Sequence, residues 1–491
     1  MNRALTTAAP LAASLSSLSS LSWVSLLALL TGCASVPTPA PTPAAPASLP
    51  AAWQAPLPHG GTAVDLTRWW TRFNDPALPG IMDAAQAASP TLASARARIE
   101  SARATRVAAG AGLLPRLDVV GSGSTGRSLP GQSTMTSASL GLQAGWEIDL
   151  FGAGSAGRDA AQARLEGAQA GWHAARVAVA AETANTLLSL RSCEAQRVQS
   201  GADTASREET ARLTDLSAQA GFTPPADAAL ARAGAAQARS QLLGQQAQCE
   251  TLVKALVEIT DVPEPALRTQ LAAATARVPQ PAPIALTALP AALLQQRPDL
   301  AEAARQVVAA AGDQAQSQAR ERPQVSLSGS LALAGLRAGG VISNGSTWAL
   351  GPLVVSLPVF DGGSRAAATA AARARYDEAV AIYQAQVRRA VREVETALVS
   401  LDATARREID AASAARDFEA SLRATQARQQ GGLASLFDLE AARRNAVQAQ
   451  SALIELQRER SAAWISLYRA LGGGWAPSDA ISAAVQPVAP R

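Results

Sequence analysis

Residues 154–220 read GSAGRDAAQARLEGAQAGWHAARVAVAAETANTLLSLRSCEAQRVQSGADTASREETARLTDLSAQA. From Ser155 onward this run contains no proline, and glycine occurs only at positions 157, 167, 171 and 201. Most of the other residues are Ala, Gln, Arg, Glu and Leu, which are strong helix formers. A helix of about 66 residues would be roughly 100 Å long. That length is far beyond a typical globular helix and predicts a coiled-coil or repeat architecture.

The helical run ends at Gly221-Phe222-Thr223-Pro224-Pro225, and a second run follows from Asp227 to about Ile259. A glycine followed by two prolines ends a helix and turns the chain. Two long helices joined by so short a connection form an antiparallel hairpin. We therefore expect one long helical hairpin over residues 154–260.

The same design recurs in the second half of the chain. Residues 363–430 form another proline-free helical run, which turns at Gly431-Gly432-Leu433-Ala434-Ser435 and resumes to about Leu471. The two turns align with Gly432 under Gly221 and Asp438 under Asp227. This correspondence predicts a tandem duplication with a period of about 210 residues and a second hairpin over 363–471.

Composition excludes several classes of function. The chain has 491 residues, of which 48% are hydrophobic and 4% aromatic, with a net charge of +4. Its cations are almost all arginines interleaved with Asp and Glu, a pattern typical of solvated helices with many ion pairs. There is no basic cluster of the kind that binds nucleic acid. His59 and His173 are the only histidines and lack metal-ligand or catalytic spacing, so we expect no enzyme, metal or cofactor.

Two short stretches of the sequence match known motifs. Gly121-Ser122-Gly123-Ser124-Thr125-Gly126 matches GxGxxG, but a dinucleotide site needs this motif to open a helix. Arg127-Ser128-Leu129-Pro130 follows instead, so we expect a surface loop. Asn344-Gly345-Ser346 matches a glycosylation sequon, but in a bacterial-type chain we expect it to be a turn.

Residues 1–32 have the pattern of an export signal, with an apolar core too short to span a bilayer. The signal ends in Leu30-Thr31-Gly32-Cys33, which resembles the lipobox of bacterial lipoproteins and predicts lipidation of Cys33. Ala34 follows instead of the aspartate that retains such lipoproteins at the inner membrane, so the expected destination is the outer membrane. Residues 33–60 are rich in Pro and Ala and predict a disordered tether.

The remaining chain divides into two repeats, at 61–262 and 291–475, joined by a Pro- and Ala-rich linker at 263–290 and followed by a disordered tail at 476–491. Each repeat has a shorter helix and a strand pair before its hairpin. The first strand pair, at about 117–149, comprises 117–121 and 138–149. The second, at about 324–360, comprises 324–334 and 348–360 around a loop at 337–347.

Four strands of about ten residues suit a transmembrane β-barrel. They cannot close a barrel alone, and open strand edges are not tolerated in lipid. We therefore expect several copies of the chain to share one barrel.

Cys193 and Cys249 are each 28 residues from Gly221, or about 42 Å along a helix. In an antiparallel hairpin, residues equally far from the turn lie at the same height. An exported chain reaches a compartment that permits disulfides. We therefore predict a disulfide between Cys193 and Cys249 that holds the two helices in register.

Six motifs together resemble the TolC-like outer-membrane efflux ducts, and in particular their NodT or OprM-like lipoprotein branch. These motifs are Leu30-Thr31-Gly32-Cys33, residues 70–75, Trp146-Glu147-Ile148-Asp149-Leu150-Phe151-Gly152, Arg297-Pro298-Asp299-Leu300, Leu357-Pro358-Val359-Phe360-Asp361-Gly362-Gly363 and Ala470-Leu471-Gly472-Gly473-Gly474. The resemblance implies an α+β membrane protein whose long hairpins form a periplasmic α-barrel. It also implies a homotrimer with one twelve-stranded β-barrel, a periplasmic adaptor and an inner-membrane RND-type pump as partners.

The resemblance places a periplasmic gate at the second turn, where a glycine is followed by Asp six and nine positions later. Gly432 and Asp438 match this pattern, whereas the later position is Ala441, next to Glu440. An acidic ring at the tip would favour cations, but Asp438 could instead cap its helix. The predicted tip and gate residues are Gly221, Phe222, Asp227, Gly432, Leu433, Ser435, Asp438 and Glu440.

The expected function is a passive exit duct of a tripartite efflux pump. One alternative is the duct of a type I protein-secretion system, and another is an envelope-tethering coiled-coil lipoprotein. The strand pairs count against a tether, which needs no barrel. The sequence does not identify the transported substrate.

Overall fold

The computed structural model describes residues 53–55, 66–127, 134–281 and 296–475. They form two compact units. The strand unit comprises the described parts of Gly110–Gly157 and Gly312–Ala370. The helical unit comprises the described parts of Thr42–Ala109, Arg158–Ala311 and Ala371–Arg491.

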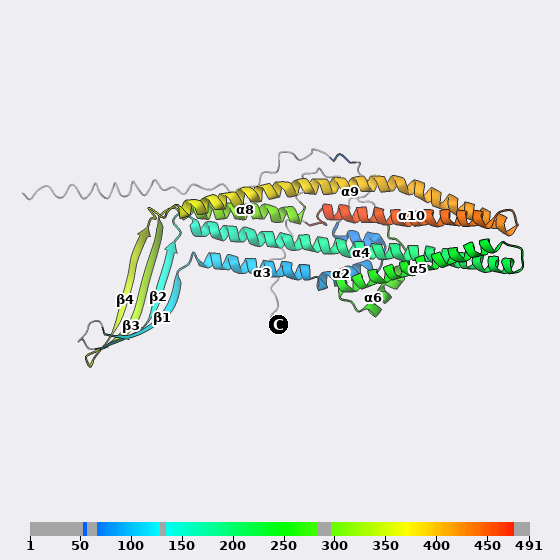
Figure 1. Cartoon of the computed structure of the whole chain (residues 1–491). Helices are drawn as coiled ribbons and strands as arrows, with labels where there is room; N and C mark the ends of the chain where they lie inside the picture. The colour runs from blue at the N-terminus through cyan, green and yellow to red at the C-terminus, as the bar shows by residue number, and fades with distance from the viewer. Residues whose placement is uncertain (1–52, 56–65, 128–133, 282–295, 476–491) are drawn as a thin grey trace, which may run out of the picture. The chain divides into compact units, whose positions relative to one another are not determined.

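The strand unit is built on one antiparallel sheet with strand order β1-β2-β3-β4 (Figure 1). Its strands are β1 (Arg116–Gly126), β2 (Met135–Ile148), β3 (Gln324–Ala338) and β4 (Val341–Ser356). β3 and β4 are joined by Gly339 and Gly340, whose φ angles are +56° and +84°. Such positive φ angles cost glycine little, which explains the tight turn.

Two expectations for this region are wrong. Gly121 to Gly126 is not a surface loop but the second half of β1, paired with Leu140 to Met135 of β2. The region 337–347 is not a loop either, since Asn344, expected in a turn, pairs with Gly335. Gly and Ser have low strand propensity, but cross-strand partners override it. Here the hydroxyls of Ser122 and Ser139 lie 2.8 Å apart, as do those of Ser124 and Ser137.

The long helices form two hairpins. The first consists of α4 (Ala153–Gln219) and α5 (Pro225–Thr260), and the second of α9 (Ser364–Gln430) and α10 (Leu436–Ala470). Figure 1 shows α5 beside α4 and α10 beside α9. Ion pairs join the arms, including Arg239–Glu208 at 2.9 Å in the first hairpin and Arg407–Glu459 at 3.0 Å in the second. The predicted combination of long helical hairpins with four strands is confirmed.

The shorter elements are η1 (Leu66–Phe73), α2 (Leu78–Ala88), α3 (Pro90–Ala111), α6 (Glu264–Leu271), η2 (Ala272–Ala274) and α8 (Pro298–Ala319). The helix α6, which was not predicted, lies within the expected linker. Pro265 stands in its first turn, where a missing N–H costs nothing. Leu267 and Leu271 are buried and hold α6 on the helical unit. No described helix has an apolar run long enough to cross a membrane.

The core of the helical unit gathers aromatic side chains from η1 and the end of α10. The rings of Trp69 and Tyr468 are stacked 4.9 Å apart, and Phe73 meets Trp69 edge-on at 4.8 Å. Leu187 of α4 and Leu398 of α9 belong to the same buried cluster. This core explains why aromatic residues are concentrated in the short stretch before α2.

Arg297 and Gly472 explain two of the sequence motifs. Arg297, at the start of α8, donates to the carbonyl oxygen of Ala470 at 2.9 Å and to Glu393 of α9 at 2.8 Å. Gly472 has a φ of +82°, and a Cβ atom there would overlap the carbonyl oxygen of Gln296. Only glycine allows both this conformation and this close approach. The motifs around Arg297 and Gly472 therefore pack directly against each other.

Candidate functional site

The two faces of the sheet differ in chemistry. Val119, Leu142, Leu331 and Trp348 are direct cross-strand neighbours and form one row across all four strands. Their exposed fractions are 71%, 40%, 53% and 79%, so all four side chains are exposed within the described chain. The row one residue away consists of Asp118, Gln143, Ser330 and Ala349. Successive residues alternate between faces, so one face is apolar here and the other carries small or polar side chains.

The first hairpin turn has the geometry predicted from its glycine. Gly221 has a φ of +79°, and the N–H of Phe222 donates to the carbonyl oxygen of Ser217 at 2.9 Å. This is the bond that closes a helix in a Schellman motif. The Phe222 side chain is 86% exposed, and Asp227 lies in the first turn of α5.

The second turn repeats this geometry. Gly432 has a φ of +74°, and the N–H of Leu433 donates to the carbonyl oxygen of Arg428 at 2.8 Å. Leu433 and Phe437 are both exposed. Each turn therefore presents apolar side chains at its tip, held by the same hydrogen-bond pattern.

Asp438 is part of the helix cap of α10. The backbone N–H and the hydroxyl of Ser435 donate to Asp438 Oδ2 at 2.9 and 2.7 Å, and the N–H of Asp438 donates to the Ser435 hydroxyl at 3.1 Å. Ser435 is thus the N-cap residue, and Asp438 is its partner in a capping box. The Ser435 hydroxyl lowers the pKa of Asp438, with a further contribution from the Ser435 N–H. The carboxylate therefore stays charged at neutral pH.

Glu440 is engaged in a partly buried ion-pair network between the hairpins. Its carboxylate lies 2.8 Å from Arg207 of α4 and 2.5 Å from Arg443 of α10. Arg207 also pairs with Asp203 at 2.9 Å. Burial lowers the pKa of Arg443, and the neighbouring Glu440 opposes that change. These contacts give Glu440 a role in joining the two hairpins.

The partners of Glu440 were not predicted from the sequence. Asp203, Arg207 and Arg443 carry no motif, and arginines alternate with acids along all of the long helices. Arg207 and Glu440 lie in different repeats, so only the packing of α4 on α10 brings them together.

Cys193 of α4 and Cys249 of α5 are bonded in the structure, with Cα atoms 5.6 Å apart. That separation is typical of a disulfide. A disulfide in the exported protein remains our prediction. Thiol counting on denatured, unreduced protein should find neither cysteine free, and modification of both would contradict the prediction.

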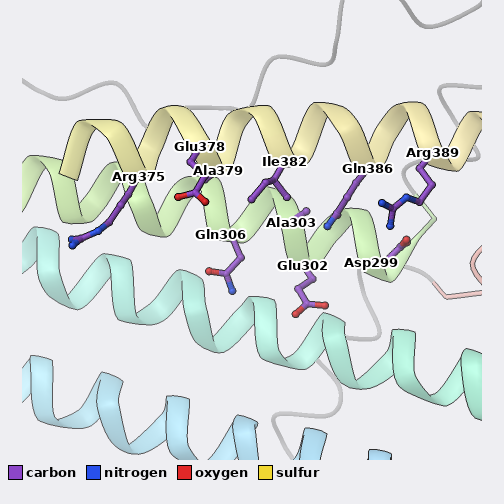
Figure 2. A pocket seen from close by; sticks show the side chains of 10 residues that line it. All are labelled: Asp299, Glu302, Ala303, Gln306, Arg375, Glu378, Ala379, Ile382, Gln386 and Arg389. Atoms are coloured by element: carbon purple, nitrogen blue, oxygen red, sulfur yellow. The ribbon is translucent and has the colours of Figure 1, made fainter. Parts of the chain in front are cut away.

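A groove of about 590 Å³ lies between α8 and α9 (Figure 2). Asp299, Glu302 and Glu378 line it together with Arg375 and Arg389. Burial raises the pKa of Glu302. Within the described ranges no three His, Cys, Asp or Glu residues lie close enough to hold a metal ion. The mixed charges give this groove no chemistry beyond that of a polar helix–helix contact.

Several predictions fall outside the described residues. These are the export signal, Cys33 and its lipidation, most of the tether, part of the linker and the tail at 476–491.

Comparisons with known proteins agree with this architecture. Residues 81–261 and 289–473 match the family "Outer membrane efflux protein". The chain is 29% identical over 470 residues to the pyoverdine export outer membrane protein OpmQ of Pseudomonas aeruginosa, covering 91% of this chain and 95% of that protein. It is 28% identical over 474 residues to the toluene efflux pump outer membrane protein TtgI of Pseudomonas putida, covering 92% and 97%.

The fold is similar to that of the outer membrane channel CmeC of Campylobacter jejuni, with a TM-score of 0.77 and 22% sequence identity. The similarity covers 86% of this chain and 92% of that one. The predicted resemblance to outer-membrane efflux ducts is confirmed. With both repeats matched over most of their length, the chain belongs to the outer membrane efflux protein family.

Proposed function

We propose that this chain is the outer-membrane exit duct of a tripartite efflux pump. It passes small molecules passively, while an inner-membrane RND-type pump supplies the energy. Relatives named for pyoverdine export and toluene efflux support this role. Because those two cargoes are chemically unlike, the relatives do not assign a substrate to this chain.

The observation that carries the proposal is the exposed apolar row of the sheet. A row of four exposed large apolar side chains is unfavourable in water but suits contact with lipid. An apolar outer face alternating with a polar inner face is the pattern of a transmembrane barrel wall. An envelope tether would have no use for such a sheet.

The edges of the sheet support assembly from several copies. Within the described chain, β1 and β4 each pair on one side only. Unpaired strand edges are not tolerated in lipid, so the edges must pair with other copies. Three copies of the four-stranded sheet give the twelve-stranded barrel of the proposed homotrimer.

The hairpin turns are the proposed contacts for the other pump components. Phe222, Leu433 and Phe437 expose apolar side chains at the two tips. Such residues suit a periplasmic adaptor protein, which would connect the duct to the inner-membrane pump. The proposed outer-membrane anchor at Cys33 rests on the lipobox.

Purified full-length protein in planar lipid bilayers tests the duct. Discrete single-channel conductance steps, together with a native mass of three chains in detergent, are the expected results. A stable monomer without conductance would exclude the duct and favour a tether. Deletion of the chromosomal copy should also increase sensitivity to at least one exported small molecule.

The acidic tip is tested by comparing Asp438→Asn with Ser435→Ala. The pKa of folded Asp438 lies below its usual value, so its contribution is present at neutral pH and is lost only as the pH falls through that lowered pKa. If its charge attracts cations, Asp438→Asn should reduce the cation preference of the channel between pH 5 and 8, whereas Ser435→Ala should keep it. Equal effects of the two substitutions would assign Asp438 to the helix cap alone.

A further inference from the structure

One carboxylate of α9 holds the first described residues of the chain. The N–H of Gln54 donates to Glu395 Oε1 at 2.8 Å, and the N–H of Ala55 donates to Glu395 Oε2 at 2.8 Å. Both oxygens of one side chain thus bind consecutive backbone amides. Hydrogen bonds to an ionised group are stronger than those between neutral groups.

Hydrophobic packing supports this contact, both next to the two amide donors and next to Glu395. Trp53 packs against the main core of the helical unit, and Ala55 belongs to that core. Glu395 lies in the middle of α9, next to the fully buried Val394 and close to Leu398. The acceptor is therefore fixed on a rigid element, while the donors come from a segment rich in Pro and Ala.

We propose that Glu395 is the docking residue of the N-terminal lipid tether, a positioning role that rests on the proposed lipidation of Cys33. Docking at Gln54 and Ala55 leaves only residues 34–52 between the acylated cysteine and the helical unit. Fully extended, the chain from Cys33 to Trp53 reaches at most about 70 Å, against about 110 Å from Cys33 to η1 at Leu66. We call the contact of Glu395 with the Gln54 and Ala55 amides the clasp, and residues 34–52 the strap. The clasp limits how far the lipid anchor can lie from α9, because only the strap then connects them.

The sequence offers a direct probe of docking. Trp53 is the only aromatic residue between Cys33 and Trp69, and Leu49 and Leu57 are each followed by proline. Chymotrypsin cleaves after aromatic residues and does not cleave before proline, so the Trp53–Gln54 bond is its preferred target in the tether. That bond is protected when the clasp is closed, because Trp53 packs on the core and the Gln54 N–H is bound.

The test measures chymotrypsin cleavage after Trp53 in full-length protein carrying Glu395→Ala or Glu395→Gln. Glu419→Gln, at an exposed position of the same helix, is the control for loss of one negative charge. Cleavage after Phe222, which is exposed at the first turn, serves as an internal reference in each sample. Mass spectrometry of reduced, denatured digests measures the rate of each of the two cleavages.

We expect cleavage after Trp53 to be at least about tenfold faster in Glu395→Ala, since two charge-assisted hydrogen bonds are lost. Glu395→Gln keeps one acceptor oxygen and should be intermediate, while Glu419→Gln should match wild type. Rapid cleavage in wild type would show that the segment is not docked. Equally slow cleavage in wild type and Glu395→Ala would show that Glu395 is not the clasp.

Labelling with palmitate separates this inference from the lipidation on which it rests. If both hold, the label leaves with the peptide ending at Trp53. Protection of Trp53 without any label would reject lipidation, and with it the strap, while leaving Glu395 as a docking residue. Labelled peptide released at equal rates from all variants would reject docking alone.

Discussion

Asp75→Ala is expected to lower the free energy of unfolding by about 3–5 kcal/mol, the usual cost of breaking a buried ion pair by removing one partner. Asp75 Oδ2 lies 2.8 Å from Nε of Arg191, and the two side chains are 1% and 0% exposed. Asp75 Oδ1 also accepts from the N–H of Ala77 at 2.9 Å. The substitution leaves a buried guanidinium whose remaining acid partner within the described chain is Glu194, at 3.0 Å.

Guanidinium titration in detergent, followed by tryptophan fluorescence, measures the change. Glu209→Ala is the control, because it removes an acid from the exposed Arg212–Glu209 pair of the same helix as Arg191. Exposed pairs contribute little, so this control should unfold close to wild type. Similar behaviour of Asp75→Ala and Glu209→Ala would mean that the buried pair does not join the segment before α2 to α4.

Leu331→Arg should impair insertion of the sheet into a bilayer. If Leu331 faces lipid near the middle of the membrane, an arginine there costs about 2–4 kcal/mol per chain. Its direct neighbours across the sheet, Leu142 and Trp348, are both exposed and apolar, so neither offers an acid to pair with the arginine. The expected result is a strong loss of folded oligomer from the outer-membrane fraction.

Ser330→Arg is the matched control one residue away. Ser330 lies on the other face, between Gln143 and Ala349, where the proposed barrel has its polar interior. Arginine should be tolerated there, and the channel should become less permeable to cations. Equal loss of folded protein in both variants would contradict the assignment of faces, whereas loss in Ser330→Arg alone would reverse it.

The ion-pair network at Glu440 changes the expected chemistry of the hairpin tips. The sequence placed Asp438 and Glu440 together as acids near a gate. In the structure, Asp438 completes a helix cap, and Glu440 pairs with Arg207 and Arg443. Asp438 thus remains the better candidate for an acidic ring, because it is exposed while Glu440 has two cationic neighbours.

The sequence by itself determined the long hairpins, because their signals are local. Helix propensity summed over many residues predicts a rod. Gly221 and Gly432 each adopt the positive φ angle at which the first helix of a hairpin ends. The sequence also predicted that Cys193 and Cys249 lie at the same level along the first hairpin, because both are equally far from its turn.

Only the tertiary structure decided the conformation of segments with weak local signals and the partners of the charged side chains. Residues 121–126 look like a loop in isolation, yet pairing with β2 makes them a strand, because the ladder satisfies their backbone groups and hydroxyls. The pairs Asp75–Arg191 and Arg207–Glu440 join positions far apart in the chain. Among many interleaved charges, only packing selects which arginine meets which acid, because ion pairing depends on distance and burial, which sequence spacing does not encode across elements.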